Sequence, residues 1–315
     1  MSAILQFEDV EGARLPAGPL HLAIGMFDGV HLGHRAVIAP AVAAARGQGG
    51  IAGVLTFSPH PSALFRPLEP TRLMQDPATK TRVLAQMGVE VVITQPFTPG
   101  FAAVPAEQFV AWLKQRLPGL VAIYVGENFR FGRGRAGHVG TLRANAPASG
   151  VEIFSSARVT VGNEPVSSTR VRQLLEAGEM EMANALLGYS YFAHGDVMPG
   201  KRLGRTIGFP TLNLHWAPAL RPRFGVYAVR VAGAKSTVSL PGVANYGLRP
   251  TVEKTAADPK LEVHVFDACP FGEGDSIAVD WLVFLRPEMK FSGLEALRAQ
   301  IARDREAAAA YFRVG

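Results

Sequence analysis

Short, continuous apolar runs alternate with helix-like stretches through the first half of the chain. Five runs read as strands, at residues 22–25, 53–57, 89–95, 121–126 and 151–154. Strands covered on both faces have this composition, because neither side of the sheet meets water. Between them, one helix begins at Asp76-Pro77 and ends at Gly88, and another spans about 106–118. This order predicts a doubly wound, Rossmann-like parallel α/β sheet with right-handed crossovers.

The pattern changes at about residue 188, beyond which apolar and polar positions alternate. Alternation at 225–231, 261–266 and 276–285 predicts half-buried strands of an antiparallel β-barrel or sandwich. One face of the last strand is expected to carry Ile277, Val279, Trp281, Val283 and Leu285. Helical patterns at 170–177 and 180–187 close the first unit. We therefore expect domains at 1–187 and 188–315.

A terminal helix is expected after the last strand. Ser292 begins it, and Glu295 three residues later completes a capping box. Leu294, Leu297 and Ile301 form its apolar stripe. The second domain is thus predicted to be a small β-fold followed by one helix.

Composition supports this organisation. The length of 315 residues fits two domains, and 48% hydrophobic with 18% charged residues is sufficient for two cores. Cys269 is the one cysteine, which excludes an internal disulfide and fits a reducing cytosol. The N-terminus has no basic segment typical of a signal peptide, and the longest apolar run, 36–45, is shorter than the ~18 residues of a membrane span. We expect a cytoplasmic protein without membrane contact.

The positive charge raises the question of nucleic acid. The net charge is +6 and the pI is about 9.7. The basic residues are mostly arginines in glycine-rich loops, at 130–135 and 201–205. Such arginines suit phosphorylated small molecules through bidentate contacts. We expect small-molecule substrates and no nucleic acid; a homo-oligomer is possible.

The most informative motif is Gly-Met-Phe-Asp-Gly-Val-His-Leu-Gly-His at 25–34, between the first predicted strand and a helix. Unpaired N–H groups and the helix dipole make such a helix start an anion site. His31 and His34 are three residues apart, and Gly33 leaves the backbone open to a phosphate. This arrangement suits attack on the α-phosphate of a nucleoside triphosphate. Two histidines here are also typical of a solvated cap or of half a zinc site.

A second glycine-rich segment has the spacing of a dinucleotide fingerprint. It contains Gly132, Gly134 and Gly137, with Glu152 twenty residues past the first glycine. However, it follows the fourth predicted strand rather than the first, and the residues after Gly137 do not predict a helix. We interpret it as a phosphate or adenine loop.

Two further segments carry hydroxyl groups near predicted element starts. Val-Ser-Ser-Thr-Arg-Val-Arg at 166–172 leads into a helix, where Ser168 and Thr169 can cap it and Arg172 can face a phosphate. A simple capped helix explains these residues equally well. In the second half, Thr211 and Asn213 share a face if their segment begins a strand, and their oxygens are hard ligands suited to Mg²⁺–nucleotide. A polar-capped turn is the common alternative.

No Gly-x-x-x-x-Gly-Lys-Ser/Thr motif occurs, which excludes a P-loop kinase. Glu262 lies on the polar face of the strand at 261–266, where a carboxylate can act as a general base or remain a surface residue.

Together these segments resemble the bacterial bifunctional riboflavin kinase/FAD synthetases. The resemblance extends from about residue 22 to 311, and the motifs at 25–34, 167–172, 208–213 and 261–266 carry it. It implies a nucleotidyltransferase-like first domain that adenylylates FMN to FAD. It also implies a riboflavin kinase-like barrel that phosphorylates riboflavin to FMN, with ATP as co-substrate and Mg²⁺ as cofactor in both reactions. Phe271 departs from the family, which commonly has Tyr before Gly272.

The resemblance also implies residue roles. His31 and His34 serve catalysis in the first domain, Glu262 activates the ribityl 5′-hydroxyl of riboflavin in the second, and Thr211 and Asn213 hold Mg²⁺. The residues expected to bind nucleotide in the first domain are Gly25, Phe27, Asp28, Gly33, Asn128, Ser168, Thr169 and Arg172. Those expected to bind nucleotide or flavin in the second are Gly200, Lys201, Gly208, Pro210 and Arg286.

Three alternatives differ from this interpretation. A single-activity enzyme would keep the other half as a scaffold, although both halves carry their polar residues. A nucleotidyltransferase for a phosphopantetheine-like acceptor would share His-x-Gly-His but lack the second domain. A flavin carrier or nucleic-acid binder would bind its ligand without ATP turnover.

Overall fold

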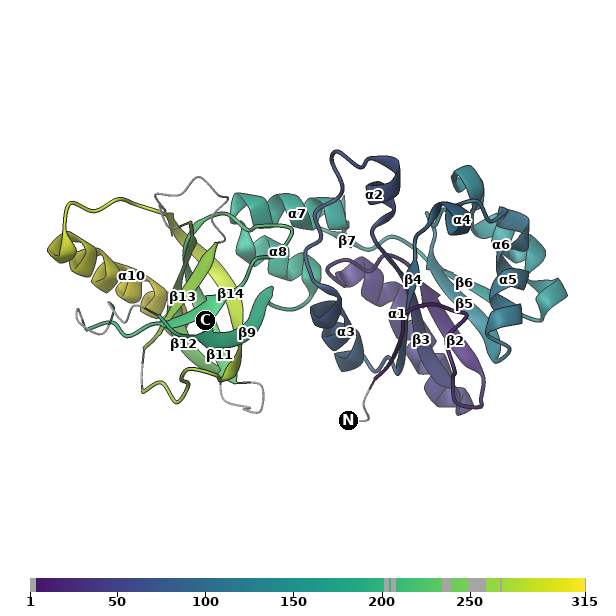
Figure 1. Ribbon diagram of the computed structural model, residues 1–315, viewed down its shortest axis with the longest axis horizontal. Coiled ribbons are helices and arrows are strands. Elements are labelled where there is room, and N and C mark those ends of the chain that lie inside the picture. Colours follow the sequence, from purple (N-terminus) through teal and green to yellow (C-terminus); the bar gives the residue numbers. More distant parts are fainter. Residues whose placement is uncertain are drawn as a thin grey trace. The chain divides into compact units, whose positions relative to one another are not determined.

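The computed structural model describes residues 4–200, 204, 208–233, 239–248, 259–266 and 268–314 (Figure 1). The chain divides into two compact units, Met1–Ser168 and Thr169–Gly315. Helices α7 (Ser168–Ala177) and α8 (Met180–Leu187) therefore group with the second unit, whereas the predicted domain boundary lies after them. In α8, the Asn184 amide donates to the Trp281 carbonyl at 2.7 Å and accepts from the Tyr191 N–H at 2.7 Å.

The first unit contains a six-stranded sheet in which all neighbouring strands are parallel. Its strands are β1 (Leu5–Phe7), β2 (Leu20–Ile24), β3 (Ile51–Ser58), β4 (Val91–Pro96), β5 (Leu120–Gly126) and β6 (Glu152–Ser156). Their order is β1-β4-β3-β2-β5-β6. The chain moves outward from β2 through β3 and β4, then returns to the other side of β2 at β5. The carboxyl ends of β2 and β5 thus meet where the strand order reverses, which is where open α/β sheets bind ligands.

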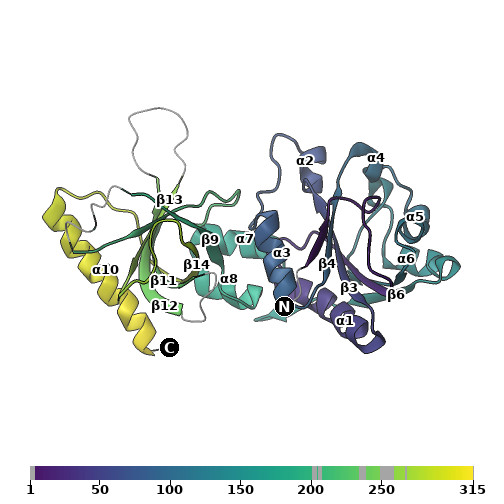
Figure 2. The ribbon, with the colours of Figure 1, turned by 60° about the horizontal axis from the view of Figure 1, so that its bottom comes forward.

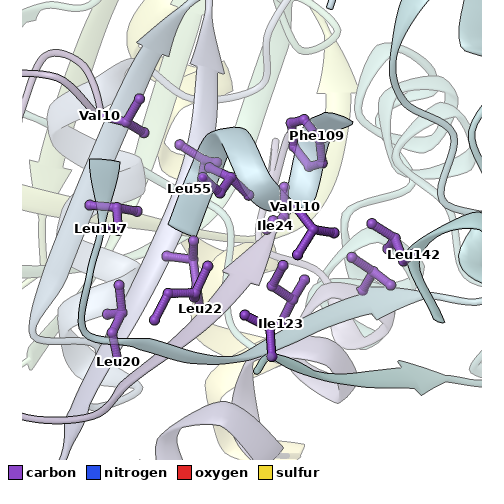
Figure 3. Packing of buried hydrophobic residues seen from close by; sticks show 14 of the residues in the cluster. Val10, Leu20, Leu22, Ile24, Leu55, Phe109, Val110, Leu117, Ile123 and Leu142 are labelled. Atoms are coloured by element: carbon purple, nitrogen blue, oxygen red, sulfur yellow. The ribbon is translucent and has the colours of Figure 1, made fainter. Parts of the chain in front are cut away.

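Helices cover both faces of this sheet (Figure 2). The helices of this unit are α1 (Leu32–Gln48), α2 (Pro61–Phe65), α3 (Pro77–Gln86), α4 (Pro99–Ala102), α5 (Phe109–Arg116) and α6 (Val139–Asn145). The unit also contains the 3-10 turns η1 (Ala106–Gln108), η2 (Arg133–Arg135) and η3 (Pro147–Ser149) and a hairpin of β7 (Thr160–Val161) and β8 (Glu164–Pro165). Figure 3 shows the packing on one face, where Leu22, Ile24 and Ile123 meet Phe109 and Val110 of α5. The predicted doubly wound sheet is confirmed.

The five predicted strands and both predicted helices are present in this unit, with ends that differ by a few residues. Strand β1 was not expected, because it is a three-residue edge strand whose mostly exposed side chains form no apolar run. The expectation that no helix follows Gly137 is wrong. Helix α6 begins at Val139, and the His138 ring accepts a hydrogen bond from the Thr141 N–H at 3.4 Å to cap it.

The glycines of the fingerprint-like segment have a packing explanation. A Cβ on Gly132 or Gly137 would lie 2.9 Å from the Cβ of Ala106 in η1. Gly134 has a φ of +64° and lines a cavity described below. The segment follows β5, not the first strand, so its place in the sheet still argues against a dinucleotide fingerprint.

The second unit contains a closed six-stranded antiparallel barrel, which confirms the barrel and excludes the sandwich. Its strands are β9 (Phe192–Met198), β10 (Leu212–His215), β11 (Gly225–Gly233), β12 (Ser239–Gly247), β13 (Lys260–Val265) and β14 (Ser276–Pro287), in the order β10-β13-β12-β11-β14-β9. Aromatic rings fill its interior: Trp281 is fully buried, with its ring centroid 4.5 Å from that of Tyr227 and 5.3 Å from that of Tyr246.

The expectation that one face of β14 carries five apolar residues is wrong beyond Trp281. The pairing of β11 with β14 shifts register between Ala228 and Val229 and again between Val226 and Tyr227. Each shift inserts an extra residue in β14, which reverses the alternation of its side chains. Trp281 consequently packs inside the barrel, whereas Val283 and Leu285 pack in the cluster under the terminal helix.

The terminal helix is α10 (Leu294–Val314), which packs on the outer side of β11 and β12. It begins later than the predicted Ser292, and Leu294 is 56% exposed, so only Leu297 and Ile301 of the predicted stripe face a cavity. Among the residues described here, no helix has the length and apolar character required to cross a membrane.

Candidate functional site

The loop from Gly25 to His31 joins β2 to α1 at the point where strand order reverses. Phe27 and Val30 have φ angles of +48° and +37°, which are strained for residues with a Cβ. Phe27 is fully buried, and a Cβ on Gly25 would lie 2.9 Å from its ring. The loop is thus held in a conformation that the chain would not adopt by itself.

His31 caps helix α1 and is only 4% exposed. Its Nδ1 accepts a hydrogen bond from the His34 N–H at 3.3 Å, so its proton is on Nε2, which lies 3.2 Å from Ser168 Oγ. The Ser168 hydroxyl in turn donates to the Asp28 carbonyl at 3.3 Å. This chain of bonds connects the two predicted motifs at 25–34 and 166–172.

The His34 ring lies between two aromatic neighbours. It stacks on the His31 ring at a centroid distance of 3.6 Å and an angle of 15°, and meets the Phe27 ring edge-on at 5.3 Å. Gly33 lies between the two histidines in the first turn of α1. The zinc half-site has no support, since the described residues contain no group of three or more His, Cys, Asp or Glu that fits a metal ion.

The remaining predicted residues near this loop are placed as follows. The buried Asp28 carboxylate accepts from the Met74 N–H at 3.0 Å. Thr169 and Arg172 follow Ser168 on α7 and belong to the second unit.

Lys80 was not predicted as a site residue, yet it contacts the same loop. Its Nζ donates to the Met26 carbonyl at 3.2 Å and to Thr56 Oγ1 at 3.0 Å, and Thr56 Oγ1 donates to that same carbonyl at 2.9 Å. Burial of the ammonium lowers the pKa of Lys80 from 10.5 to about 8, although the nearby Asp28 carboxylate raises it. A partly buried lysine on α3 therefore anchors the start of the loop.

A cavity of about 720 Å³ opens beside the loop, and we call it the aromatic cavity. Its walls are mainly phenylalanine rings, with three arginines and the predicted residues Gly25 and Asn128: Phe57, Phe65, Phe97, Phe101, Phe109, Phe129, Phe131, Arg66, Arg130 and Arg135. The Asn128 amide oxygen lies 2.6 Å from Arg158 Nε in the orientation that satisfies both side chains. The rings of His31 and His34 do not line this cavity.

A second cavity, of about 250 Å³, lies between the outer face of the barrel strands and α10. We call it the strand-face cavity. Strand β13 pairs with β10 on one side and β12 on the other, and in this register Glu262 faces both Asn213 and Asn245. Residues opposite one another in a sheet project to the same side. Asn213, Glu262 and Asn245 thus form a row of polar side chains, and all three line the cavity with Thr211.

Gly200, at the start of the glycine-rich segment before β10, lies against this row. A Cβ on Gly200 would clash with the Asn213 side-chain amide, which would have to move to make room for it. Gly208 has a φ of +85°, and Pro210 directly precedes Thr211. Lys201 lies outside the described residues.

Two charged groups of the strand-face cavity are already bonded within the protein. Arg286 forms a two-bond ion pair with Asp304 of α10, at 2.7 Å from Nε and 2.6 Å from Nη2. Burial raises the pKa of Glu288, which bonds the Leu248 N–H and Asn245. Asn245, Glu288 and Asp304 were not predicted. Asn245 reaches the cavity through the pairing of β12 with β13, Glu288 follows the end of β14, and Asp304 lies on α10.

Two family models match separate parts of the chain. Residues 17–170 match the family model described as FAD synthetase, and residues 187–312 match the one described as riboflavin kinase. The curated bifunctional riboflavin kinase/FMN adenylyltransferases of Escherichia coli (strain K12) and Bacillus subtilis (strain 168) are 39% and 36% identical to this chain, over 92% of it and 92% of each relative. A crystal structure from Streptococcus pneumoniae, titled a macrolide-efflux protein, matches 97% of this chain and 98% of its own with a TM-score of 0.85 and 27% identity. That title applies to the other protein; for this chain the match shows the fold.

Proposed function

Because the chain belongs to the bifunctional riboflavin kinase/FMN adenylyltransferase family, we propose that its two units divide the two reactions between the sites described above. The chain is an enzyme that phosphorylates riboflavin to FMN and adenylylates FMN to FAD, with ATP as the second substrate of each reaction. Phosphorylation belongs to the strand-face cavity, and adenylyl transfer belongs to the loop at 25–31. The row of Asn213, Glu262 and Asn245 on one cavity wall is the observation that carries this assignment. Since both reactions consume ATP, we place the enzyme in the cytosol.

Glu262 acts as the general base of the kinase reaction in this proposal. Its carboxylate accepts the proton of the ribityl 5′-hydroxyl while the oxygen attacks the γ-phosphorus of ATP and ADP leaves. The side-chain oxygens of Thr211 and Asn213 fit Mg²⁺, which takes few protein ligands together with water and phosphate oxygens, and both line the cavity beside Glu262. When bound, the metal neutralises charge on the triphosphate. Because Arg286 is bonded to Asp304, we assign it to holding α10 over the cavity rather than to nucleotide.

In the adenylyl transfer reaction the FMN phosphate attacks the α-phosphorus of ATP in line, and pyrophosphate leaves. The first turn of α1, with its N–H groups and the positive end of the helix dipole, and the His34 ring stabilise the charge that develops on the α-phosphate. His31 is the supporting residue, because both of its ring nitrogens are bonded and it is almost fully buried. Ser168, whose hydroxyl lies 3.2 Å from His31 Nε2, binds the departing phosphates.

The aromatic cavity is the proposed site for the flavin ring of FMN. Its volume of about 720 Å³ is in the usual range for small-molecule pockets, which is roughly 300–1,000 Å³. Phenylalanine rings suit stacking against a planar aromatic ligand. Arg130 and Arg135 supply positive charge for the FMN phosphate.

Two variants test the division of labour. Purified protein is incubated with riboflavin and Mg-ATP, and the flavin products are separated by chromatography. His31→Ala combined with His34→Ala is expected to abolish FAD while FMN accumulates. With FMN supplied, Glu262→Gln is expected to retain FAD synthesis but to slow phosphorylation of riboflavin by ~10²–10⁴, the usual contribution of a general base. If either variant damages both reactions equally while remaining folded, the assignment is wrong.

A further inference from the structure

The proposed kinase mechanism leaves one buried histidine of the strand-face cavity without a role. His264 lies on β13 two residues after Glu262, so both side chains are on the same face of the strand. It is 7% exposed. Its Nδ1 lies 2.8 Å from the carbonyl oxygen of Pro210, on the residue before Thr211.

This contact lies where the backbone ladder stops. The pairing of β10 with β13 ends at Leu212 opposite Val263. Pro210 has no N–H and cannot donate to a further rung. The His264 side chain bonds the Pro210 carbonyl instead. Thr211 is therefore held between two fixed points, the imidazole bond on one side and the Leu212 rung on the other.

The bond also defines the state of the ring. A carbonyl can only accept, so Nδ1 carries the proton and Nε2 has the lone pair. Nε2 is shielded from solvent and has no hydrogen-bond partner in the described part of the chain. Burial lowers the pKa of His264, which favours the neutral ring. The Phe209 ring packs against it edge-on at 5.4 Å. Among the described residues, the hydrogen bond of this imidazole is thus the one from Nδ1–H to the Pro210 carbonyl.

We propose that His264 is a positioning residue of the kinase site, which sets the position of Thr211 through the bond from Nδ1–H to the Pro210 carbonyl. This inference rests on the proposed role of Thr211 and Asn213 in holding metal-bound ATP. Loss of the bond frees Thr211 to move, while Glu262 stays in the ladder of β13. The defect is therefore confined to Mg-ATP and does not extend to riboflavin.

The two nitrogens can be separated by substitution. In His264→Asn, the amide nitrogen takes the place of Nδ1, because both are bonded to Cγ. In His264→Gln, the amide nitrogen takes the place of Nε2. His264→Leu removes both groups and keeps a similar apolar volume. The three variants thus separate the bond to Pro210 from a contact through Nε2 and from packing.

The experiment measures riboflavin kinase kcat, KM for Mg-ATP, KM for riboflavin and the Mg²⁺ concentration for half-maximal rate. His264→Gln and His264→Leu should raise KM for Mg-ATP and the Mg²⁺ requirement by about tenfold, as is usual when a group that orients a metal ligand is lost. KM for riboflavin should stay within about twofold of its original value, and His264→Asn should restore most of the Mg-ATP affinity. Adenylyl transfer by the same preparations is the internal control, and fluorescence of Trp216 and Trp281 reports the fold of the barrel.

Several results would overturn the inference. An Asn variant as impaired as the Leu variant, or a Gln variant that behaves as the original protein, would show that Nδ1 is not the important atom. An equal rise in KM for Mg-ATP and in KM for riboflavin would indicate that the His264 ring acts only through its packing. Should the Leu variant fail to fold, the Asn and Gln pair still decides.

Thr211→Val separates the inference from the proposed function. If it leaves the Mg²⁺ dependence unchanged, the role of Thr211 itself is wrong. If it raises the Mg²⁺ requirement while His264→Gln does not, only the inference fails. If both Thr211→Val and His264→Gln raise the Mg²⁺ requirement, the variant that combines them should be less impaired than the sum of the two effects, because both substitutions act on one contact.

Discussion

Replacing Lys80 by Met should stabilise the first unit at neutral pH. The Lys80 ammonium is part-buried under the loop at 25–31, and its hydrogen-bond partners in the described part of the chain are neutral oxygens, the Met26 carbonyl at 3.2 Å and Thr56 Oγ1 at 3.0 Å. Met has a similar length and no charge. The Met26 carbonyl keeps its bond from Thr56 at 2.9 Å, so the change leaves no buried acceptor without a partner.

The magnitude follows from the pKa of Lys80. Burial lowers this pKa from 10.5 to about 8, which corresponds to about 3 kcal/mol of destabilisation at pH 7, at about 1.4 kcal/mol for each pH unit. The two lost hydrogen bonds offset roughly 2 kcal/mol of this, at about 1 kcal/mol each. The Met variant is therefore expected to be more stable by about 1 kcal/mol at pH 7.

The same argument predicts a reversal with pH. Because the folded-state pKa of Lys80 is lowered, the unfolded chain binds more protons between pH ~8 and 10.5, and the stability of the original protein rises with pH across this window. The Met variant lacks this dependence. Its advantage should therefore shrink above pH 8 and become a deficit near pH 10.

Pulse proteolysis in urea, with the surviving fragments identified by mass, reads the unfolding of the first unit separately from that of the barrel. Lys114→Met is the matched control, since the Lys114 ammonium also makes two hydrogen bonds to neutral oxygens, the carbonyls of Pro118 and Leu120, at 2.9 and 2.7 Å. It should only lose stability. A Lys80→Met variant that is less stable at pH 7, or one whose difference from the original protein does not change with pH, would refute the reasoning.

Three other changes have outcomes that follow from single contacts. Gly200→Ala places a Cβ against the Asn213 side-chain amide and displaces it, so KM for Mg-ATP in the kinase reaction should rise by about tenfold while adenylyl transfer is unchanged. Arg286→Lys breaks the two-bond pair with Asp304, which should lower the free energy of unfolding of the barrel by about 1–3 kcal/mol in urea titrations and raise KM for riboflavin. Burial lowers the pKa of His21, so the folded first unit binds its proton less tightly than the unfolded chain, and stability should fall as pH drops below 6.5; His21→Gln should weaken this dependence in pulse proteolysis.

The strands of both units were predictable where burial leaves a regular pattern. Central strands such as β3 are covered on both faces and read as continuous apolar runs. Strand β1 is three residues long at an edge and carries no such pattern. In β14 the apolar alternation continues through the bulge, and only the pairing with β11 shows that Trp281 and Val283 face opposite sides. The position of a bulge depends on the pairing with the neighbouring strand, so it cannot be predicted from the apolar pattern of one strand alone.

The two candidate sites differ in how much local sequence could predict. His31 and His34 share one turn, and their motif is visible within ten residues. The bond from His31 to Ser168 joins positions 137 residues apart, and only the family resemblance connected those motifs. Likewise Glu262 was predicted from its strand, whereas Asn245 beside it depends on the register of β12. Local patterns thus predict which residues carry chemistry, and pairing across the fold selects their neighbours.

The two proposed sites differ in their catalytic groups because the nucleophiles of the two reactions differ in protonation state. The 5′-hydroxyl of riboflavin is a neutral alcohol and must lose a proton as it attacks, so its site needs a base, and Glu262 supplies a carboxylate to the strand-face cavity. The phosphate of FMN is already an anion at pH 7, since phosphate monoesters have a second pKa of about 6. Its attack needs positive potential rather than a base. The start of α1 supplies N–H groups and imidazoles, and the nearby Asp28 carboxylate is turned toward the Met74 N–H. In the proposed assignment, the glutamate-bearing strand and the histidine-bearing helix start thus match the protonation states of the two nucleophiles.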